Sequence, residues 1–577
     1  MDRIRRSIHN ILDIMTTHRA SGCIVVLFMS MFVLFLYLEI ETYQPHPSIL
    51  FRICGALADA SILTLPLVFL RGKWRYLGAA VPVAVGALVL VNVLYYRNFN
   101  DLVPASLYVN NQAGDSLVME SAIESLRWSD VLLLVFGLLP LLWLHGDRKR
   151  HMDRCDRRFT FIALVCLAVF GWGVTLFGTL RREIIARPDE KVSISHAFFP
   201  VVATDWIRVY NNMNFTGYMA NVIRRSKIKY KELTSGDIVD IQGYLSSKAA
   251  GAVYTTDSCS KRNLIFIVVE SLASVVLQRE DAGVIAPVLT ELTKDTTTVY
   301  VRRCKVLAGL GRSSDAQFMY NTGLLPLRDD VLVTNYAVND YPSLAKALRL
   351  ESVEVIGEDR RMWSHGQTNR SYGFTRLVDN ASSGDDRLNQ DSAIFAAAKA
   401  EIKQMSRPFY IFVSTLSMHD PYTTPTVTRR LDSPSVESND PRDREYLERV
   451  RHFDESLGNF IQFLKDEGIY ESTAVVITGD HEIRGTTVSS SLHDDAVPLI
   501  ILNSPVGGLH VDEATQLDVF PTVMDVMGGK YEYMGVEYTG LGTSVFRRSA
   551  GSGVRMPDVR DYEISEMLIR RRCGSTR

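Results

Sequence analysis

The stretch Asn263-Leu-Ile-Phe-Ile-Val-Val269 is apolar along its length and is followed directly by Glu270. A run that is apolar on both faces is typical of a strand buried in a parallel sheet. Phe409-Tyr-Ile-Phe-Val413 and Ala474-Val-Val-Ile477 are two further runs of this kind. Helix-length segments separate them, and this alternation predicts a mainly parallel central sheet covered by helices. We therefore expect an α/β domain in the second half of the chain.

Polar residues follow each of these three runs. Glu270 follows the first, His419 comes shortly after the second, and Asp480-His481 follow the third. Ligands of open α/β sheets bind beyond the carboxyl ends of the strands, so we expect these side chains to face one crevice. Singly, each has an ordinary alternative as a solvated loop or turn residue. Their joint occurrence at three strand ends favours a shared site.

A glycine-bracketed turn, Gly309-Leu-Gly311-Arg312, precedes a predicted helix. Glycine permits unusual backbone angles, so amide groups here can converge on an oxyanion at the helix N-terminus, and Arg312 adds a guanidinium. We expect Ser313 to leave the turn before the helix begins and to point its hydroxyl into the crevice. We expect Ser314 to cap the helix by accepting a backbone N–H. Taken alone, the stretch is equally explained as a simple helix cap.

Glu270, Asp480, His481 and the Ser313 hydroxyl form a mixed oxygen and nitrogen ligand set. Such a set suits a divalent cation, with Mn²⁺, Mg²⁺ and Zn²⁺ as the choices. The ion would lower the pKa of the hydroxyl and bind a phosphoryl oxygen, which makes Ser313 the predicted nucleophile. No thiolate contributes, so a closed structural zinc site is disfavoured.

The first 180 residues hold most of the apolar windows that approach the length of a membrane span. We predict five spans, at roughly 21–40, 49–70, 77–96, 130–145 and 159–180. The fourth is short, and its existence is argued from charge, because three basic clusters fall on one side of the membrane only if it crosses. The clusters are Arg3, Arg5, Arg6 and Arg19; Arg71, Lys73 and Arg75; and Arg148, Lys149, Arg150, Arg154, Arg157 and Arg158.

The basic clusters also predict how the chain is oriented across the membrane. Positive residues stay cytoplasmic, so the amino terminus is expected inside and everything after the fifth span outside. No small-residue cleavage pattern follows the first span, which we therefore keep as an anchor. The expected domains are a membrane domain (1–180), a juxtamembrane linker with interfacial helices (181–237), an extracytoplasmic catalytic domain (238–548) and a basic C-terminal tail (549–577).

The net charge and the cysteine spacing argue against several classes of protein. The formal net charge of −2 gives no basic field for nucleic acid. The seven cysteines are scattered without the spacing of a disulfide framework or a zinc knuckle, and only a Cys259–Cys304 bridge stays open.

Taken in order, these features resemble a known family. Five spans followed by Glu270, Gly311-Arg-Ser-Ser-Asp315, His419 and Gly479-Asp-His481 closely resemble the lipoteichoic acid synthase branch of the alkaline phosphatase and sulfatase superfamily. The family reads Gly-Lys-Thr-Ser-Asp at the turn, and its first hydroxyl residue is the metal-bound nucleophile, matched here by Ser313. The resemblance implies Glu270, Ser313, Asp480 and His481 as metal ligands, with Mn²⁺ as first choice. It also makes His419 a substrate contact.

The resemblance implies a reaction as well. A phosphoglycerol-like headgroup would pass from a membrane phospholipid through a covalent phosphoserine to an extracytoplasmic acceptor, an envelope glycan or lipid. Splitting the transfer in two suits a membrane enzyme, because donor and acceptor need not be present together. The expected location is the bacterial inner membrane, with several spans and the catalytic domain outside.

Three other functions predict different sequence features. Sulfatases of the superfamily need Pro and Arg two and four positions after the nucleophile, where this chain has Asp315 and Gln317. Phosphoethanolamine transferases share the spans and fold but usually carry several outer disulfides. A non-enzymatic lipid-binding domain would predict an eroded metal set.

One segment departs from the family. The family's His-Gly-Asn-Asn-Lys-Thr-Phe-Trp-Asn-Arg reads Ile356-Gly-Glu-Asp-Arg-Arg-Met-Trp363-Ser-His365 here. Trp363 is kept, whereas His and Arg are replaced, and the loss of an arginine is not conservative for phosphate binding. We expect Trp363, His365 and Arg312 to contact the substrate, and the headgroup preference to differ from that of a strict phosphatidylglycerol enzyme. His493 is a further candidate for phosphate contact, with an ordinary surface histidine as the alternative.

Overall fold

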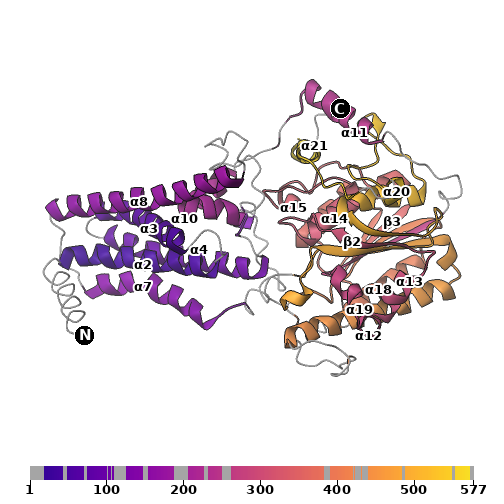
Figure 1. Cartoon of the computed structure of the whole chain (residues 1–577), viewed down its shortest axis with the longest axis horizontal. Helices are drawn as coiled ribbons and strands as arrows, with labels where there is room; N and C mark the ends of the chain where they lie inside the picture. The colour runs from indigo at the N-terminus through magenta and orange to yellow at the C-terminus, as the bar shows by residue number, and fades with distance from the viewer. Residues whose placement is uncertain are drawn as a thin grey trace. The chain divides into compact units, whose positions relative to one another are not determined.

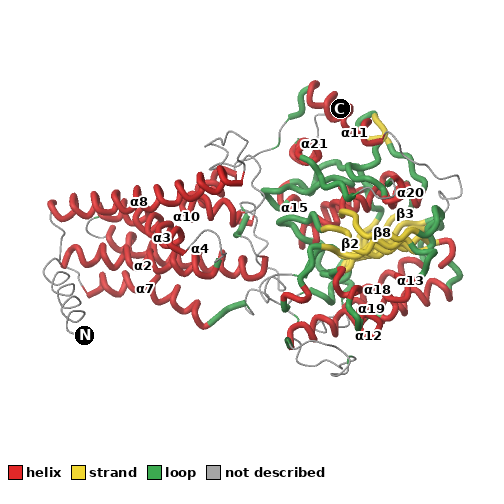
Figure 2. The backbone as a smooth tube through the Cα atoms, in the orientation of Figure 1, coloured by secondary structure: helices red, strands yellow, loops and turns green. Residues whose placement is uncertain are grey.

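The computed structural model describes residues 19–42, 49–70, 74–99, 125–146, 154–186, 206–225, 232–249, 262–382, 390–419, 440–483, 488–548 and 553–571, with a few single positions between them. The chain forms two compact units. The first comprises Met1–Val109 and Ser116–Ile228, and the second Asn110–Asp115 and Lys229–Arg577. Figure 1 and Figure 2 show a helical first unit and a second unit built around a sheet.

The first unit is a bundle of apolar helices. Four of them are long and apolar enough to cross a membrane, over Ile24–Glu41, Ile49–Phe69, Trp74–Arg97 and Arg157–Arg181. The fourth predicted span is a helix too, but the shorter apolar stretch Trp128–Leu142. The prediction of five spans before an α/β domain is therefore confirmed as four to five apolar helices followed by that domain. The helices are α2 (Arg19–Glu41), α3 (Ile49–Thr64), α4 (Trp74–Phe99), α7 (Val131–Gly146), α8 (Arg154–Ala186) and α10 (Trp206–Arg225).

A buried ionic group ties three of these helices together. Arg97 of α4 donates to both carboxylate oxygens of Asp130, at 2.8 and 2.9 Å, just before α7. The Tyr37 hydroxyl of α2 donates to the same carboxylate at 2.6 Å. A two-pronged arginine–carboxylate contact of this kind is among the stronger pairings in proteins.

The second unit contains an eight-stranded sheet in the order β4-β3-β5-β1-β6-β7-β2-β8. Only β7 runs antiparallel to its neighbours, which confirms the mainly parallel sheet. The strands are β1 (Asn263–Val269), β2 (Val299–Lys305), β3 (Glu351–Ile356), β4 (Arg376–Val378), β5 (Phe409–Ser414), β6 (Thr473–Gly479), β7 (Ala496–Leu502) and β8 (Leu509–Thr515).

Helices cover both faces of this sheet (Figure 1). On one face α18 (Gln390–Ile402) packs on α19 (Pro441–Asp466), with Phe395 and Phe460 stacked 4.8 Å apart. On the other, α14 (Ser313–Thr322) places Tyr320 against Phe266 of β1, their rings 5.6 Å apart. Also labelled in the figure are α12 (Ala282–Ile285), α13 (Pro287–Lys294), α15 (Leu332–Asn335) and α20 (Val519–Met527). Apolar burial on both faces of β1, β6 and β7 fixes the centre of the core.

Residues 549–577, expected as a basic tail, contain helix α21 (Val559–Arg570). Its buried side chains include Ile564, Leu568 and Ile569. Asp561 forms an ion pair with Lys248 of α11 (Ser235–Ala249) at 2.7 Å. This helix therefore contributes to the core of the second unit, because its apolar residues recur at helical spacing between the arginines.

Candidate active site

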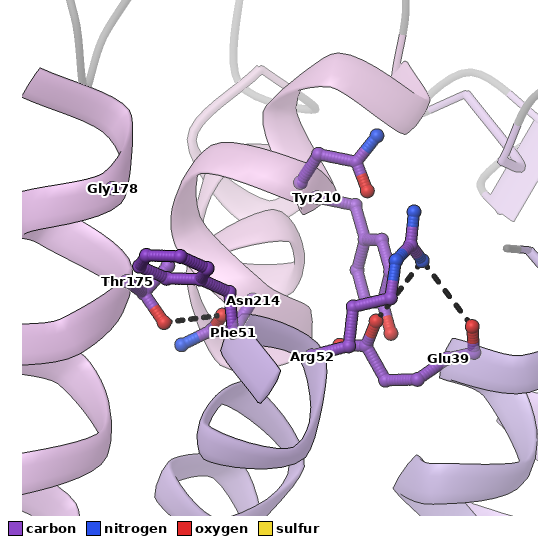
Figure 3. A pocket seen from close by; sticks show the side chains of 8 residues that line it. Glu39, Phe51, Arg52, Thr175, Gly178, Tyr210 and Asn214 are labelled. Carbon is purple, nitrogen blue, oxygen red and sulfur yellow. Dashed lines mark hydrogen bonds and ion pairs between the residues drawn. The ribbon is translucent and has the colours of Figure 1, made fainter. Parts of the chain in front are cut away.

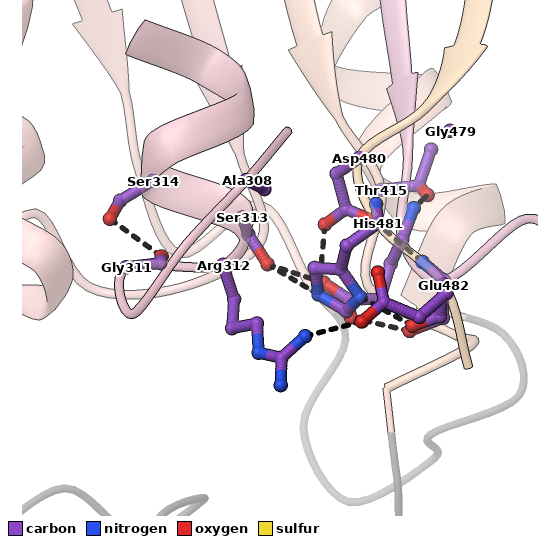
Figure 4. Close-up of polar contacts among 12 residues, drawn as sticks. Ala308, Gly311, Arg312, Ser313, Ser314, Thr415, Gly479, Asp480, His481 and Glu482 are labelled. Carbon is purple, nitrogen blue, oxygen red and sulfur yellow. Dashed lines mark hydrogen bonds and ion pairs between the residues drawn. The ribbon is translucent and has the colours of Figure 1, made fainter. Parts of the chain in front are cut away.

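The site is built where β1 and β6 end side by side. Val269 and Gly479 are register partners, so the next residues of both strands emerge together. One ligand atom each from Glu270, Asp480 and His481 lies within 4.8 Å of the others. All three side chains are buried. The carboxyl ends of parallel strands thus bring together three of the residues expected at this crevice, Glu270, Asp480 and His481. Figure 4 shows Asp480 and His481 beside Ser313.

Two backbone amides hold the Asp480 carboxylate, and a hydroxyl holds that of Glu270. Asp480 Oδ1 accepts from the amides of Ser271 and His481, both at 2.7 Å, while Glu270 Oε1 accepts from the Ser271 hydroxyl at 2.9 Å. Burial, and then the charge of Glu270, raises the pKa of Asp480 to about 6. Two carboxyl groups this close and this buried favour a cation between them.

His481 presents its second ring nitrogen to the carboxylates. Its Nδ1 lies 2.8 Å from the carbonyl oxygen of Glu482, a contact that requires the proton on Nδ1. Nε2 is then an acceptor, 3.4 Å from Glu270 Oε1 and 3.5 Å from Asp480 Oδ2. A histidine fixed in this way by a carbonyl is typical of a metal ligand. Two carboxylates and an imidazole therefore fit a divalent ion.

Ser313 is the first residue of α14, and its hydroxyl faces this cluster (Figure 4). Its Oγ is 3.2 Å from Glu270 Oε2 and 3.2 Å from His481 Nε2. The preceding residue, Arg312, has a positive φ of 45°, a conformation that non-glycine residues seldom adopt. Such strain clusters at functional sites, and here it sets the direction in which the helix starts.

The amides of the turn do not converge on an outside oxyanion, as the sequence analysis expected. The amides of Gly309 and Gly311 donate to Asp315 Oδ2 at 3.0 and 2.9 Å. A Cβ on Gly311 would collide with the Asp315 carboxylate and with Ser314 Oγ, so glycine is needed for this close approach rather than for a positive φ. Burial raises the pKa of Asp315 to about 7 despite the two amides. The amides of the turn therefore bind the side-chain carboxyl group of Asp315 instead of an external ligand.

Ser314 does not cap the helix by accepting an N–H, which corrects the expectation above. Its hydroxyl donates to the carbonyl oxygen of Gly311 at 2.7 Å and is buried. Ser314→Ala should lower the free energy of unfolding by about 1 kcal/mol, because one buried hydrogen bond is lost. Turnover should stay within a few fold of the parent, since this hydroxyl points away from the cluster. Thermal unfolding and a turnover assay of the same preparation check both parts. A thousandfold loss of turnover would contradict this arrangement.

Arg312 is engaged at the mouth of the site. Its Nη1 donates to Glu482 Oε1 at 2.5 Å, so the turn that carries Ser313 is linked to the residue after His481. Both side chains remain partly exposed, at 16% and 29%. A guanidinium here can exchange its partner for an incoming phosphate without being newly buried.

Gln516 is a positioning residue that the sequence analysis missed. Its Oε1 accepts from the amides of Leu307 and Ala308, and its Nε2 donates to the carbonyl oxygen of Asp480 at 2.6 Å. One buried amide thus holds the nucleophile's turn against the end of β6. Thr415 acts similarly, because its hydroxyl accepts from the amide of Glu270 at 3.1 Å. Neither residue belongs to a pattern that marks such a role in sequence.

Three further residues were predicted to contact the substrate, namely His419, Trp363 and His493. His419 is half-buried in the turn after β5, with its amide bonded to the Leu416 carbonyl. Asp391 organises that turn by accepting from the amides of Leu416 and Ser417. Trp363 is half-buried after β3 and has a φ of 44°. His493 is exposed before β7.

His365 does not face a substrate pocket, which corrects the prediction that it contacts the headgroup. Its side chain is 3% exposed, with Nε2 3.0 Å from Glu358 Oε1 and Nδ1 3.5 Å from Glu354 Oε1. Both ring nitrogens therefore face glutamates already. Ile356 is likewise buried, in β3. Ile356 and His365, which replace the family's His and Arg, are therefore part of the core, and the structure does not support a headgroup contact for either.

The His365 cluster predicts a pH dependence of stability. Burial acts to lower its pKa, but Glu354 and Glu358 outweigh burial and raise the pKa from 6.5 to about 10. Since the folded pKa is the higher one, the stabilisation is full below about pH 6.5 and is lost as the pH rises through about 10. Unfolding of the parent and of His365→Gln across pH 6 to 10 checks this. The difference should shrink with rising pH, whereas His510→Gln, at an exposed histidine, should follow the parent. A gap that stays constant would contradict the assignment.

Cys304 lies buried in β2 as a free thiol, and burial raises its pKa well above the ordinary value. Cys259, its predicted possible partner, lies outside the described residues.

Comparison with known proteins gives two family matches. The sulfatase model matches residues 262–529, the part that contains the cluster and the turn. The model of the lipoteichoic acid synthase N-terminal domain matches residues 3–191. The N-terminal match precedes the sulfatase match along the chain, which is the order that the sequence analysis expected.

Curated relatives and a solved structure agree with this. Lipoteichoic acid synthase 2 of Bacillus subtilis (strain 168) is 23% identical over 469 residues, which cover 76% of this chain and 70% of the relative. Lipoteichoic acid synthase of Staphylococcus saprophyticus is 23% identical over 473 residues, covering 76% and 71%. Among solved structures, lipooligosaccharide phosphoethanolamine transferase A from Neisseria meningitidis aligns with a TM-score of 0.52 at 13% identity, over 88% of this chain and 96% of that one. At that identity the likeness concerns the fold alone.

Proposed function

Because this chain is a lipoteichoic acid synthase-like member of the sulfatase and alkaline phosphatase superfamily, we propose that it transfers a phosphoglycerol-like headgroup between membrane-bound partners. The donor is a membrane phospholipid, and the acceptor is an envelope glycan or lipid. The multi-pass helical unit lies in the bacterial inner membrane, with the second unit on the extracytoplasmic side. The positive-inside pattern of the loops supports this orientation.

The observation that carries the proposal is the position of Ser313. Its hydroxyl lies 3.2 Å from both Glu270 and His481. It stands at the start of a helix and beside the carboxyl ends of the central strands β1 and β6. A serine beside two acidic ligands and a histidine, without an arginine-and-proline formylglycine pattern, supports phosphoryl rather than sulfate chemistry. The assignment of Ser313 as nucleophile follows from this geometry together with the family's turn motif.

The reaction would proceed in two displacements. Ser313 Oγ bonds to the phosphorus of the donor, the bond from phosphorus to the glycerol oxygen of the lipid breaks, and the serine proton ends on that oxygen as diacylglycerol leaves. The acceptor hydroxyl then attacks the same phosphorus and frees Ser313. Glu270, Asp480 and His481 would hold a divalent ion, with Mn²⁺ preferred over Mg²⁺ and Zn²⁺, and this ion would supply positive charge to the serine oxygen and the phosphoryl group.

Other residues bind and orient the phosphoryl group. We assign phosphate contact to Arg312, which would turn from Glu482 to the substrate, and to His419 beyond β5. Trp363 would pack on the headgroup from the end of β3. His493 stays a weaker candidate, because an exposed loop histidine often has no such role.

Intact-mass measurement tests the proposal. Incubating the purified full chain with phosphatidylglycerol and Mn²⁺ but no acceptor should add one phosphoglycerol group, mapped to the peptide that contains Ser313. Ser314→Ala should carry the same adduct, and Ser313→Ala should carry none. Activity without any adduct in the parent would contradict a covalent intermediate.

A further inference from the structure

Buried polar side chains hold the backbone together in both units. In the first unit, Arg52 of α3 forms an ion pair with Glu39 of α2 at 3.2 Å (Figure 3). It also donates to the carbonyl oxygens of Glu39 and Thr42, so the end of α2 is fixed against α3. In the second unit, a similar group of buried bonds surrounds Ser271, the residue that follows Glu270. That group reaches two of the expected metal ligands, so its effect extends to the site.

Ser271 bonds to both carboxylates of the site. Its amide donates to Asp480 Oδ1 at 2.7 Å, and its hydroxyl donates to Glu270 Oε1 at 2.9 Å. The residue is buried and has a φ of 51°, a conformation that non-glycine residues seldom adopt. Backbone strain of this kind persists only where the surroundings fix it, and it clusters at functional sites. One strained residue thus holds carboxylates that follow two different strands, β1 and β6.

These bonds use one oxygen of each carboxylate. Asp480 Oδ1 already accepts from two amides, of Ser271 and His481, whereas Oδ2 lies 3.5 Å from His481 Nε2. Glu270 Oε1 accepts from Ser271, whereas Oε2 lies 3.2 Å from the Ser313 hydroxyl. In each carboxylate, the oxygen that Ser271 does not engage therefore faces another residue of the site and is the one better placed for a cation.

Helix α19 holds Ser271 through a buried tyrosine. The Tyr446 hydroxyl donates to the Ser271 carbonyl oxygen at 2.9 Å, and the Tyr446 side chain is fully buried. About one turn further along α19, Arg449 donates to the carbonyl oxygen of Ser417 at 2.6 Å, in the turn after β5. Because β5 and β1 are neighbours in the sheet, one helix holds the backbone beyond both strands. A site supported by a packed helix keeps its geometry better than one that rests on loops alone.

We propose that Ser271, held by Tyr446, is a positioning residue that orients the two carboxylates for a divalent ion and favours Mn²⁺ over Ca²⁺. The inference rests on the metal centre proposed above. Ca²⁺ binds through about six to eight oxygens and often takes both oxygens of one carboxylate. Ser271 engages one oxygen of each carboxylate, which works against that mode of binding.

Metal binding by the full chain tests this without lipid or turnover. Purified parent and variants are stripped of metal with EDTA and titrated with Mn²⁺, whose free concentration is read from its electron paramagnetic resonance signal. Ser271→Ala removes the bond to Glu270 and should lower Mn²⁺ affinity at least about tenfold, the loss typical of an outer partner. Tyr446→Phe keeps the ring and should lower it about fivefold, the loss expected for one hydrogen bond. Competition with Ca²⁺ should show that Ser271→Ala loses less affinity for Ca²⁺, because the freed carboxylate can bind Ca²⁺ with both oxygens.

Tyr538→Phe is the matched control, because Tyr538 is also a buried tyrosine whose hydroxyl donates to a backbone carbonyl. That carbonyl belongs to Thr322, at the end of α14 opposite to Ser313. The control should be destabilised about as much as Tyr446→Phe, and it should bind Mn²⁺ like the parent. Mn²⁺ affinity that is unchanged in Ser271→Ala or in Tyr446→Phe would overturn the positioning role, as would an equal loss in the control. Equal losses for Mn²⁺ and Ca²⁺ would overturn the selectivity. A parent that binds no Mn²⁺ would overturn the metal centre as well, so the two failures can be told apart.

Discussion

Ser313→Ala is expected to reduce turnover by at least about a thousandfold while leaving the fold intact. Ser313 Oγ is the nucleophilic atom that we propose, and it lies 3.2 Å from both Glu270 and His481. Alanine suits the first turn of a helix, and the contacts that the hydroxyl loses, to Glu270 and His481, are both long at 3.2 Å. The free energy of unfolding should therefore change by less than about 0.5 kcal/mol.

The measurement pairs a turnover assay with thermal unfolding of the same sample, and Ser314→Ala serves as the control. The two serines are adjacent but point apart, since Ser314 Oγ bonds back to the Gly311 carbonyl (Figure 4). The control should lose stability and keep turnover, which is the opposite pattern. If Ser314→Ala lost turnover and Ser313→Ala kept it, the nucleophile would be misassigned.

Strand ends could be predicted because they depend on simple rules. A strand buried on both faces is visible in the sequence as an unbroken apolar stretch. The residue that follows this stretch must lie at the carboxyl end of the strand. Glu270, Asp480 and His481 were brought together by this reasoning, and the structure has their ligand atoms within 4.8 Å of one another. The membrane helices were also visible, because length and hydropathy are properties of the sequence itself.

Local polar partnerships could not be predicted in the same way. The turn before Ser313 offered amides and a nearby carboxylate, and its pattern does not say whether the amides bind a ligand or Asp315. His365 shows the same limit. A histidine aligned with a phosphate-binding arginine was expected to contact the substrate, but Glu354, facing inward from β3, and Glu358 hold it in the core. Partners separated by many residues, such as Gln516 and Leu307, leave no periodic signal at all.

His481→Ala is expected to remove both the bound metal and turnover. The imidazole offers Nε2 to the cluster because Nδ1 is fixed by the Glu482 carbonyl at 2.8 Å. Without it, the two carboxylates must share a cation with one strong ligand fewer, and loss of even an outer partner typically lowers metal affinity about 10- to 100-fold. Turnover should fall with occupancy, because the cation supplies the charge for the serine oxyanion.

The test measures metal per chain in purified parent, His481→Ala and His510→Ala, after equilibration with limiting Mn²⁺. His510 is exposed on β8, away from the three ligands, so its variant controls for metal held by surface imidazoles. Thermal unfolding of His481→Ala should remain a single cooperative transition, because Glu270 and Asp480 keep their bonds to Ser271. A cooperative fold with little metal would assign His481 as a ligand. Full occupancy in His481→Ala would remove it from the ligand set, and lost cooperativity would instead make its main role structural.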